Sequence, residues 1–373
     1  MDKGIHILGL GNLGKYVAYG LRRSQQTIAA SGHLLPVTLI FHRDGLLADW
    51  KSADRSIWYT CNTSQTSPAA KKSRATGFRV ELLANAAAGN REAEGQPDVT
   101  VGSNAPIRHL IVATKTYATA AALAPIKHRL SKDSDILFLQ NGMGVTDEVS
   151  EKLFPDPDTR PTYWAGICSA GVYSTAPFSL VHAGHGPLAI GLVAGGRSSN
   201  LPPPMEENPM VAQLLNAPVL EAGLNSPVRS VGDQLRKLVI NSIINPLTAL
   251  FNCKNGHVFE SHEGEDLFRH LLQEAGPIVR ALFPDQSNLF LHEAFSDEFL
   301  GKLVKSVVTA TANNTSSMLQ DIQAGRRTEI DYINGYLVSQ GERLGLPTTH
   351  HAAVYGRIKK LEAGHREQHV QEA

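Results

Sequence analysis

Residues 5–14 read IHILGLGNLG, and the mainly apolar stretch KYVAYGL follows at 15–21. The apolar run predicts a buried strand, and the Gly-x-Gly-x-x-Gly pattern predicts a tight turn into a helix. Glycines let the backbone approach a pyrophosphate, whose charge is favoured at the positive end of a helix. This order predicts a dinucleotide site rather than a turn with only a structural role. The site would comprise Gly9, Leu10, Gly11, Asn12, Leu13 and Gly14.

A second apolar run, residues 37–41, ends in His42, Arg43 and Asp44. At this place an acidic residue accepts hydrogen bonds from the ribose of NAD, whereas an arginine suits the additional phosphate of NADP. Arg43 precedes Asp44, so the sequence favours NADP. The alternative is that Arg43 is a solvated loop charge.

Further strand-like runs at 110–113 and 136–139 flank a helix-like stretch at 118–130. Alternating strands and helices predict a doubly wound parallel sheet, whose ligand lies beyond the carboxyl ends of the strands. Lys115 and Asn141 follow two such ends, so both are candidates to face a ligand. Residues 165–168 predict a closing strand, and 178–182 with 188–192 predict two more that could pair as a hairpin.

Two segments of the first part look different from the rest. Residues 61–105 are rich in Ser, Thr, Ala, Gly and Asn and are typical of an insertion, with a possible strand at 78–83. Residues 195–209 contain three consecutive prolines and predict an exposed loop. We assign chemistry to neither.

After residue 227 the strand-like runs nearly vanish and helical patterns follow, including long candidate helices at 266–282, 298–324 and 329–344. The sequence therefore predicts an α/β Rossmann domain over 1–227 and an all-α domain over 228–373. A chain of 373 residues also exceeds what one hydrophobic core usually supports.

The first helix of the second domain carries a polar stripe. Residues four apart lie on one helical face, so Lys237, Asn241 and Asn245 share a face of an otherwise apolar segment. Pro246 predicts a kink or boundary just after the stripe. The stripe either faces water as a helix edge, or faces a cleft with Lys237 as proton donor and the amides as substrate ligands.

Charge, hydropathy and cysteine content indicate which macromolecular partners and which cellular compartment to expect for this protein. Formal net charge is zero and the pI is about 7.3, which gives no reason to expect a nucleic-acid or anionic-membrane partner. No apolar run approaches the roughly 20 residues of a membrane span, and the first strand begins too early for a signal peptide. The three cysteines, Cys61, Cys168 and Cys253, form no zinc motif. We expect a cytoplasmic protein without a metal, and interpret His182-x-x-His185 as part of a turn.

Several motifs together resemble the ketopantoate reductase (2-dehydropantoate 2-reductase) family, over nearly the whole chain apart from the two unusual segments. They are the glycine turn, Lys115, Gln140-Asn141-Gly142, Lys237-x-x-x-Asn241-x-x-x-Asn245-Pro246-Leu247-Thr248, Asn255-Gly256, and the runs SSMLQD at 316–321 and TEID at 328–331.

The resemblance implies NADPH-dependent reduction of 2-dehydropantoate to pantoate, on the route to pantothenate and coenzyme A. It also implies a Rossmann domain followed by a helical domain like that of 6-phosphogluconate dehydrogenase. Lys237 resembles the family's general acid, and Glu329 resembles the carboxylate that orients it or relays its proton.

The remaining roles follow from the same resemblance. Asn241, Asn245, Asn255 and Ser317 would bind the substrate, with Ser316 open as the alternative to Ser317. Lys115, Asn141 and Arg43 would serve the cofactor side.

The chain departs from the family where many members carry a histidine, since Ala170 or Gly171 stands there. This departure leaves open the reduction of another branched 2-oxo acid. A non-catalytic NADP-binding sensor is a separate alternative. A homodimer is possible.

Overall fold

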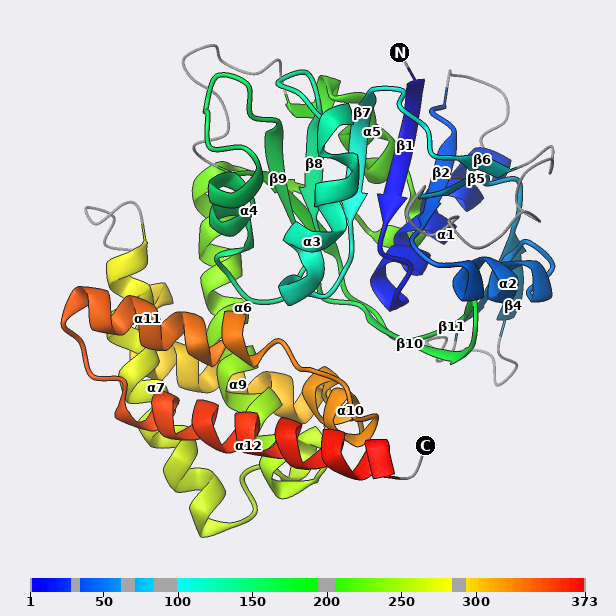
Figure 1. The fold of residues 1–373 in the computed structure, drawn as a ribbon. Coiled ribbons are helices and arrows are strands. Elements are labelled where there is room, and N and C mark those ends of the chain that lie inside the picture. The colour runs from blue at the N-terminus through cyan, green and yellow to red at the C-terminus, as the bar shows by residue number, and fades with distance from the viewer. Residues whose placement is uncertain are drawn as a thin grey trace. The chain divides into compact units, whose positions relative to one another are not determined.

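The computed structural model describes residues 2–27, 34–61, 71–83, 99–193, 205–283 and 293–371 (Figure 1). It divides into a first unit, Met1–Gln140 with Thr146–Ser230, and a second unit, Asn141–Val145 with Val231–Ala373. The α/β first unit and helical second unit confirm the predicted fold class. The assignment of cofactor binding to one domain and substrate binding to the other stays a proposal.

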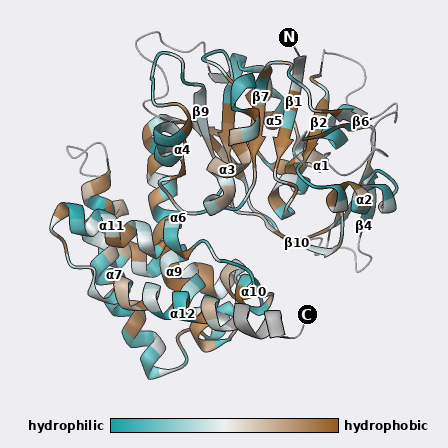
Figure 2. Ribbon diagram, in the orientation of Figure 1, coloured by the Kyte–Doolittle hydropathy of each residue, from teal (hydrophilic) through white to brown (hydrophobic). Residues whose placement is uncertain are grey.

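The first unit is built on a nine-stranded sheet in the order β13-β12-β9-β8-β7-β1-β2-β5-β6. All neighbours from β6 to β9 run parallel, whereas β12 runs antiparallel to β9. The apolar runs of the sequence form the central strands, which carry mostly hydrophobic residues (Figure 2). The strands are β1 Asp2–Leu8, β2 Val37–Phe41, β5 Arg79–Leu82, β6 Val99–Val101, β7 Ile107–Val112, β8 Asp135–Phe138, β9 Thr162–Cys168, β12 Leu188–Leu192 and β13 Gly223–Asn225.

Helices cover both faces of this sheet (Figure 1), as the connections between parallel strands require. They are α1 Asn12–Thr27, α2 Asp44–Ser52, α3 Thr119–Leu123, α4 Val145–Leu153 and α5 Pro209–Leu215. The predicted single helix at 118–130 is wrong in detail. The 3-10 turns η1 Thr116–Ala118 and η2 Ala124–Arg129 enclose α3, and Pro125 stands at the start of η2.

A second, four-stranded sheet has the order β10-β11-β3-β4, formed by Gly171–Ala176, Ser179–Gly184, Ile57–Cys61 and Lys71–Ala75. The possible hairpin of 178–182 with 188–192 is wrong. β11 already has β10 and β3 on its two edges, so β12 pairs with β9 in the large sheet instead.

The segments set apart by composition are partly described. Residues 61–105 contribute β4 to the small sheet and β5 and β6 to the edge of the large one, and the predicted strand at 78–83 is confirmed as β5. Residues 62–70 and 84–98 lie outside the described ranges, as do 194–204. The last part of the predicted loop forms η3 Met205–Glu207 and the start of α5.

The second unit is helical, with apolar and polar bands on its helices (Figure 2). Its elements are α6 Pro227–Phe251, η5 Asn255–His257, α7 His262–Leu282, α9 Asp297–Ala310, α10 Ser317–Gln323, η6 Ile330–Tyr332, α11 Asn334–Leu344 and α12 Thr349–Gln371. α12 packs against α7, α10 and α11.

Two helix predictions for this unit need correction. Residues 298–324 form two helices, because Ser316 accepts a hydrogen bond from the backbone N–H of Leu319 and so begins α10 anew. Residues 329–344 begin with η6, and α11 begins only at Asn334.

Pro246 does not end α6, as one prediction had it, because a side chain from α11 compensates for it. Proline lacks the N–H that would bond the carbonyl of Ser242 four residues earlier. Asn334, which is fully buried, donates Nδ2 to that carbonyl at 2.9 Å and lies 3.0 Å from Nδ1 of His351. The helix therefore continues through Pro246 to Phe251.

In the described residues, no helix is both long and apolar enough to span a membrane.

Candidate active site

The glycine turn joins β1 to α1 and has no room for side chains at two of its positions. Gly9 has φ +96°, and a Cβ there would lie 2.4 Å from the backbone nitrogen of Thr114. A Cβ on Gly14 would lie 1.9 Å from the carbonyl oxygen of Gly9. Gly11 is exposed, Asn12 and Leu13 are half-buried, and Leu10 is buried. The turn thus leaves backbone exposed at the amino end of a 16-residue helix, which fits a dinucleotide pyrophosphate.

The backbone just before Lys115 lies against this turn. The connections from β1 and β7 lead to opposite sides of the sheet, so the strand order reverses between them, and ligands bind at such a point. The half-buried Lys115 follows β7, one residue after the Thr114 that contacts Gly9. Gln140, at the end of β8, donates Nε2 to Thr119 at 3.2 Å. These contacts place polar groups around the carboxyl ends of β1, β7 and β8.

Lys15 is a further polar residue of this region, which the sequence analysis missed. It lies on the first turns of α1, is 7% exposed, and donates Nζ to Ser174 Oγ of β10 at 2.6 Å. Ser174 in turn donates to Asn12 Oδ1 at 2.6 Å. Burial lowers the pKa of Lys15 to about 8. A lysine among the apolar residues 13–21 is the signal that would have revealed it.

Arg43 lies exposed at the end of β2, in extended backbone immediately before α2. Asp44 begins α2, and its Oδ1 is buried without a hydrogen-bond partner in the described part of the chain. Both residues that bear on the choice between NADP and NAD therefore stand at the same strand end.

The polar stripe of α6 is largely withdrawn from water. Asn245 is 8% exposed, and Lys237 and Asn241 are half-buried. The hydroxyl of Thr248 donates to the carbonyl of Asn245 at 2.8 Å and lies 2.6 Å from the hydroxyl of Ser316. The stripe is thus connected to the start of α10.

The two serines at the start of α10 have different surroundings. Ser316 is buried, and its oxygen accepts the Leu319 N–H at 3.1 Å. Ser317 is the exposed first residue of the helix. The hydroxyl of Ser317 is therefore the more accessible of the two.

Asn255, in η5, is 7% exposed and joined to the loop after α9. Its Nδ2 donates to Thr311 Oγ1 at 2.9 Å, and its backbone N–H donates to the Asn314 carbonyl at 3.0 Å. Within the described ranges, its Oδ1 is buried without a hydrogen-bond partner. That oxygen retains the capacity to accept one.

Glu329 and Asn141 are brought together in the second unit, although they lie 188 positions apart. Asn141 Nδ2 donates to the buried Glu329 Oε2 at 3.2 Å. The next residue, Gly142, has φ +80°, and a Cβ there would lie 2.3 Å from the Tyr332 carbonyl oxygen. The backbone N–H of Met143 donates to that carbonyl at 2.9 Å. The Asn-Gly pair is therefore packed against the Glu329 segment.

The His182-x-x-His185 pair has other partners. His182 is buried, with Nδ1 2.6 Å from the Tyr59 hydroxyl and Nε2 2.8 Å from the Gly184 carbonyl. His185 Nδ1 lies 3.0 Å from Glu221. Among the residues that the structure describes, no group of three or more His, Cys, Asp or Glu could hold a metal ion.

Two family models match the chain. Ketopantoate reductase PanE/ApbA matches residues 5–195, and Ketopantoate reductase PanE/ApbA C terminal matches residues 230–362. The chain belongs to this family. It is thus an oxidoreductase of a family that uses a nicotinamide cofactor, and the glycine turn of this reductase fits such a group.

Named relatives differ in substrate. The probable 2-dehydropantoate 2-reductase of Schizosaccharomyces pombe is 36% identical over 251 residues, covering 65% of this chain and 71% of the relative. Ketoisovalerate reductase BEA2 of Gibberella fujikuroi is 28% identical, covering 97% of this chain and 84% of the relative.

A solved D-mandelate dehydrogenase, with NADH and anilino(oxo)acetate, shares the fold of this reductase. It has a TM-score of 0.70 and 18% identity, and covers 97% of this chain and 99% of its own.

Proposed function

We propose that this reductase converts 2-dehydropantoate to pantoate with NADPH, in pantothenate and coenzyme A biosynthesis. The observation that carries the proposal is the hydrogen bond from Asn141 to Glu329. It joins two motifs that the family resemblance assigns to one site. The half-buried Lys237 and Asn241 and the buried Asn245, on one face of α6, support the same function.

The bound cofactor supplies the hydride that reduces the ketone. Reduction places negative charge on the ketone oxygen, and that oxygen must gain a proton. Lys237 is the proposed general acid, because an ammonium offers both a proton and electrostatic stabilisation of that charge. Glu329 is the proposed carboxylate that orients Lys237 or relays its proton. Asn141 holds Glu329 by donating to Oε2.

The proposed substrate ligands are Ser317, Asn241, Asn245 and Asn255. Ser317 is preferred to Ser316 for the substrate carboxylate, because Ser316 accepts the Leu319 N–H and contacts Thr248, whereas Ser317 is exposed.

Residues of the first unit are the proposed cofactor ligands: Gly9 to Gly14, Lys115 and Arg43. Arg43 would bind the 2′-phosphate of NADPH, and its exposure at the end of β2 leaves the guanidinium accessible. The buried Oδ1 of Asp44 favours the alternative, since a ribose hydroxyl of NAD would satisfy it.

Ketoisovalerate is the second candidate substrate, favoured by the relative that matches 97% of this chain. It differs from 2-dehydropantoate in lacking the hydroxymethyl group, and with it the primary hydroxyl. A site that hydrogen-bonds a substrate hydroxyl discriminates strongly against the analogue without it, because the site's polar group is left unpaired. We assign the recognition of that hydroxyl to Asn255, whose Oδ1 has no hydrogen-bond partner among the described residues.

The test is NADPH oxidation with each 2-oxo acid, by the wild type and by Lys237→Ala. We expect 2-dehydropantoate to have the higher kcat/KM, and the variant to lose about 10²-fold or more in kcat, the scale of a general acid. A higher kcat/KM for ketoisovalerate would move the assignment to that acid. A folded wild type that binds NADPH but reduces neither acid would favour the non-catalytic sensor.

A further inference from the structure

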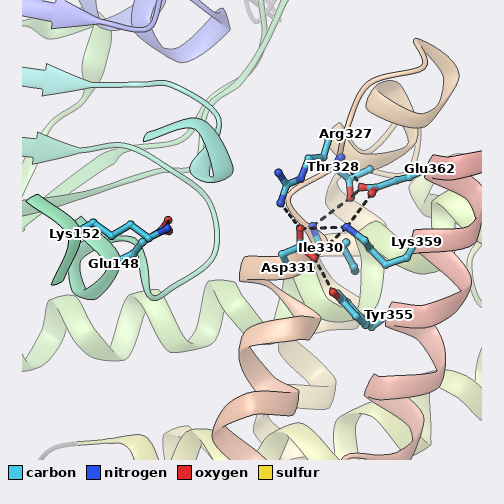
Figure 3. Close-up of polar contacts among 9 residues, drawn as sticks. All are labelled: Glu148, Lys152, Arg327, Thr328, Ile330, Asp331, Tyr355, Lys359 and Glu362. Atoms are coloured by element: carbon cyan, nitrogen blue, oxygen red, sulfur yellow. Dashed lines mark hydrogen bonds and ion pairs between the residues drawn. The ribbon is translucent and has the colours of Figure 1, made fainter. Parts of the chain in front are cut away.

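The short segment that carries Glu329 is fastened to α12 on both sides of that residue (Figure 3). Tyr355, Lys359 and Glu362 make the attachments from α12. Their spacing of four and then three residues places them on one face of the helix. The C-terminal helix therefore bonds the backbone N–H of Thr328 and the side chains of Thr328 and Asp331, the two neighbourhoods that flank Glu329.

Thr328, which is fully buried, fixes the amino side of Glu329. Its backbone N–H and its hydroxyl both donate to Glu362 Oε1, at 2.7 and 2.6 Å. The same hydroxyl oxygen accepts the N–H of Ile330 at 3.2 Å. One side chain thus ties the residues before and after Glu329 to each other and to α12.

Asp331 fixes the carboxyl side. Its Oδ2 accepts from Arg327 at 2.7 Å, and its Oδ1 accepts from the hydroxyl of Tyr355 at 2.8 Å. Lys359 Nζ lies 3.2 Å from Asp331 Oδ1 and 3.2 Å from Glu362 Oε2, which links the two attachments. Burial by itself would raise the pKa of Asp331, but the hydrogen bonds from Arg327 and Tyr355 and the nearby Lys359 lower it overall.

The charges of this cluster cancel without Glu329. Arg327 and Lys359 carry two positive charges, and Asp331 and Glu362 carry two negative ones. The carboxylate of Glu329 instead accepts from Asn141. The cluster therefore holds the residues on both sides of Glu329 without needing its charge for balance.

We infer that Thr328 and Glu362 are positioning residues of the active site, which hold Glu329 in the orientation that the reduction requires. The inference rests on the proposed role of Glu329. A glutamate has several rotatable bonds, so its carboxylate is placed accurately only if its backbone is fixed. Misplacing a catalytic group by about 1 Å costs on the order of 10²-fold in rate.

The test compares Thr328→Val, which removes the hydroxyl, with Thr328→Ser, which keeps it. Single-turnover NADPH oxidation measures the chemical step directly. We expect Thr328→Val to slow this step by roughly tenfold to hundredfold, with little change in the KM for either ligand. Thr328→Ser should stay close to the wild-type rate. If Thr328→Ser is as slow as Thr328→Val, the hydroxyl is not what positions Glu329 and the inference fails.

A double-mutant comparison separates positioning from a general loss of stability. In a Glu329→Gln background, Thr328→Val should have almost no further effect, because the group that it positions is already gone. An equal fall in both backgrounds would overturn the inference. Where Thr328→Val does not fold, Glu362→Gln replaces it, since an amide oxygen is a weaker acceptor than a carboxylate. Glu362→Gln should slow the chemical step less than Thr328→Val does, and it should have no further effect in the Glu329→Gln background.

The outcomes also separate this inference from the proposed function. A slow Glu329→Gln together with a wild-type rate for Thr328→Val overturns only the inference. A folded wild type that reduces no 2-oxo acid overturns both.

Discussion

The buried amide of Asn334 offers a quantitative test of how α6 tolerates a proline. In Asn334→Leu the side chain keeps nearly the same size but loses both donors. The carbonyl of Ser242 then has neither this amide nor an N–H from Pro246, and Nδ1 of His351 loses its donor. Burial lowers the pKa of His351 to about 4, so the ring is neutral at pH 7 and does not supply a charge in compensation.

The magnitude follows from counting the buried polar groups. Leaving a buried acceptor unpaired costs about 1–3 kcal/mol, so two acceptors cost about 2–6 kcal/mol. Leucine also removes the Asn334 Oδ1, which is buried without a partner among the described residues. Removing that unpaired acceptor stabilises the folded state by about 1–3 kcal/mol. We expect a net loss of roughly 1–3 kcal/mol in the free energy of unfolding of the second unit.

The matched background is Pro246→Ala. Alanine restores the N–H that bonds the Ser242 carbonyl within α6, so Asn334→Leu should cost about 1–3 kcal/mol less in that background. Urea unfolding measures both costs. Trp50, Trp58 and Trp164, the three tryptophans of the chain, all lie in the first unit, so their fluorescence reports on that unit. Circular dichroism reports on the helices of both.

The transition seen by circular dichroism should shift to lower urea concentration in Asn334→Leu. An equal cost of Asn334→Leu in the proline and alanine backgrounds would refute the proposed compensation.

Three further predictions concern ligands. Lys15→Met should weaken NADPH binding, measured by nicotinamide fluorescence. Wild-type affinity should fall as pH rises through about 8, where a lysine of lowered pKa loses its charge, whereas the variant should show no such step. The free energy of unfolding should change with pH in the opposite direction to NADPH affinity. Between pH about 8 and the ordinary pKa of 10.5, Lys15 is neutral in the folded protein but protonated in the unfolded chain, so unfolding takes up a proton and stability rises with pH. The cost of burying Lys15 is therefore smallest above that range. Arg43→Gln should raise the KM for NADPH by roughly tenfold or more, because one charged hydrogen bond is lost. The KM for NADH should not change. If the KM rises equally for both cofactors, Arg43 does not bind the 2′-phosphate. Asn255→Leu should reduce kcat/KM for 2-dehydropantoate more than for ketoisovalerate, and a uniform loss would argue against recognition of the hydroxyl.

Short stretches of sequence were sufficient to predict those features that a local physical constraint decides. The turn at Gly9 requires positive φ and close backbone contact, and few residues other than glycine satisfy both. The apolar runs that became β1, β2 and β7 had to be buried in a parallel sheet, and the spacing of Lys237, Asn241 and Asn245 placed them on one face of α6. Both the fold class and the family followed from such patterns.

Helix boundaries and strand partners were less predictable, since distant groups decide them. Residues 298–324 have apolar residues throughout, yet the Ser316 hydroxyl caps a new helix and also contacts Thr248 of α6. β12 pairs with β9 because β11 is already paired on both edges. Asn334 of another helix supplies the donor that Pro246 lacks.

The sequence by itself determined the kind of protein and most of its candidate site residues, because glycine turns and helical spacing are local properties. Only the tertiary structure decided which of these residues meet. Lys15 contacts Ser174 across 159 positions, and Asn141 contacts Glu329 across 188. The attachment of Thr328 and Asp331 to α12 is likewise invisible in the sequence. A buried polar group takes whichever partner the folded chain brings within hydrogen-bonding distance, and sequence spacing does not encode that distance.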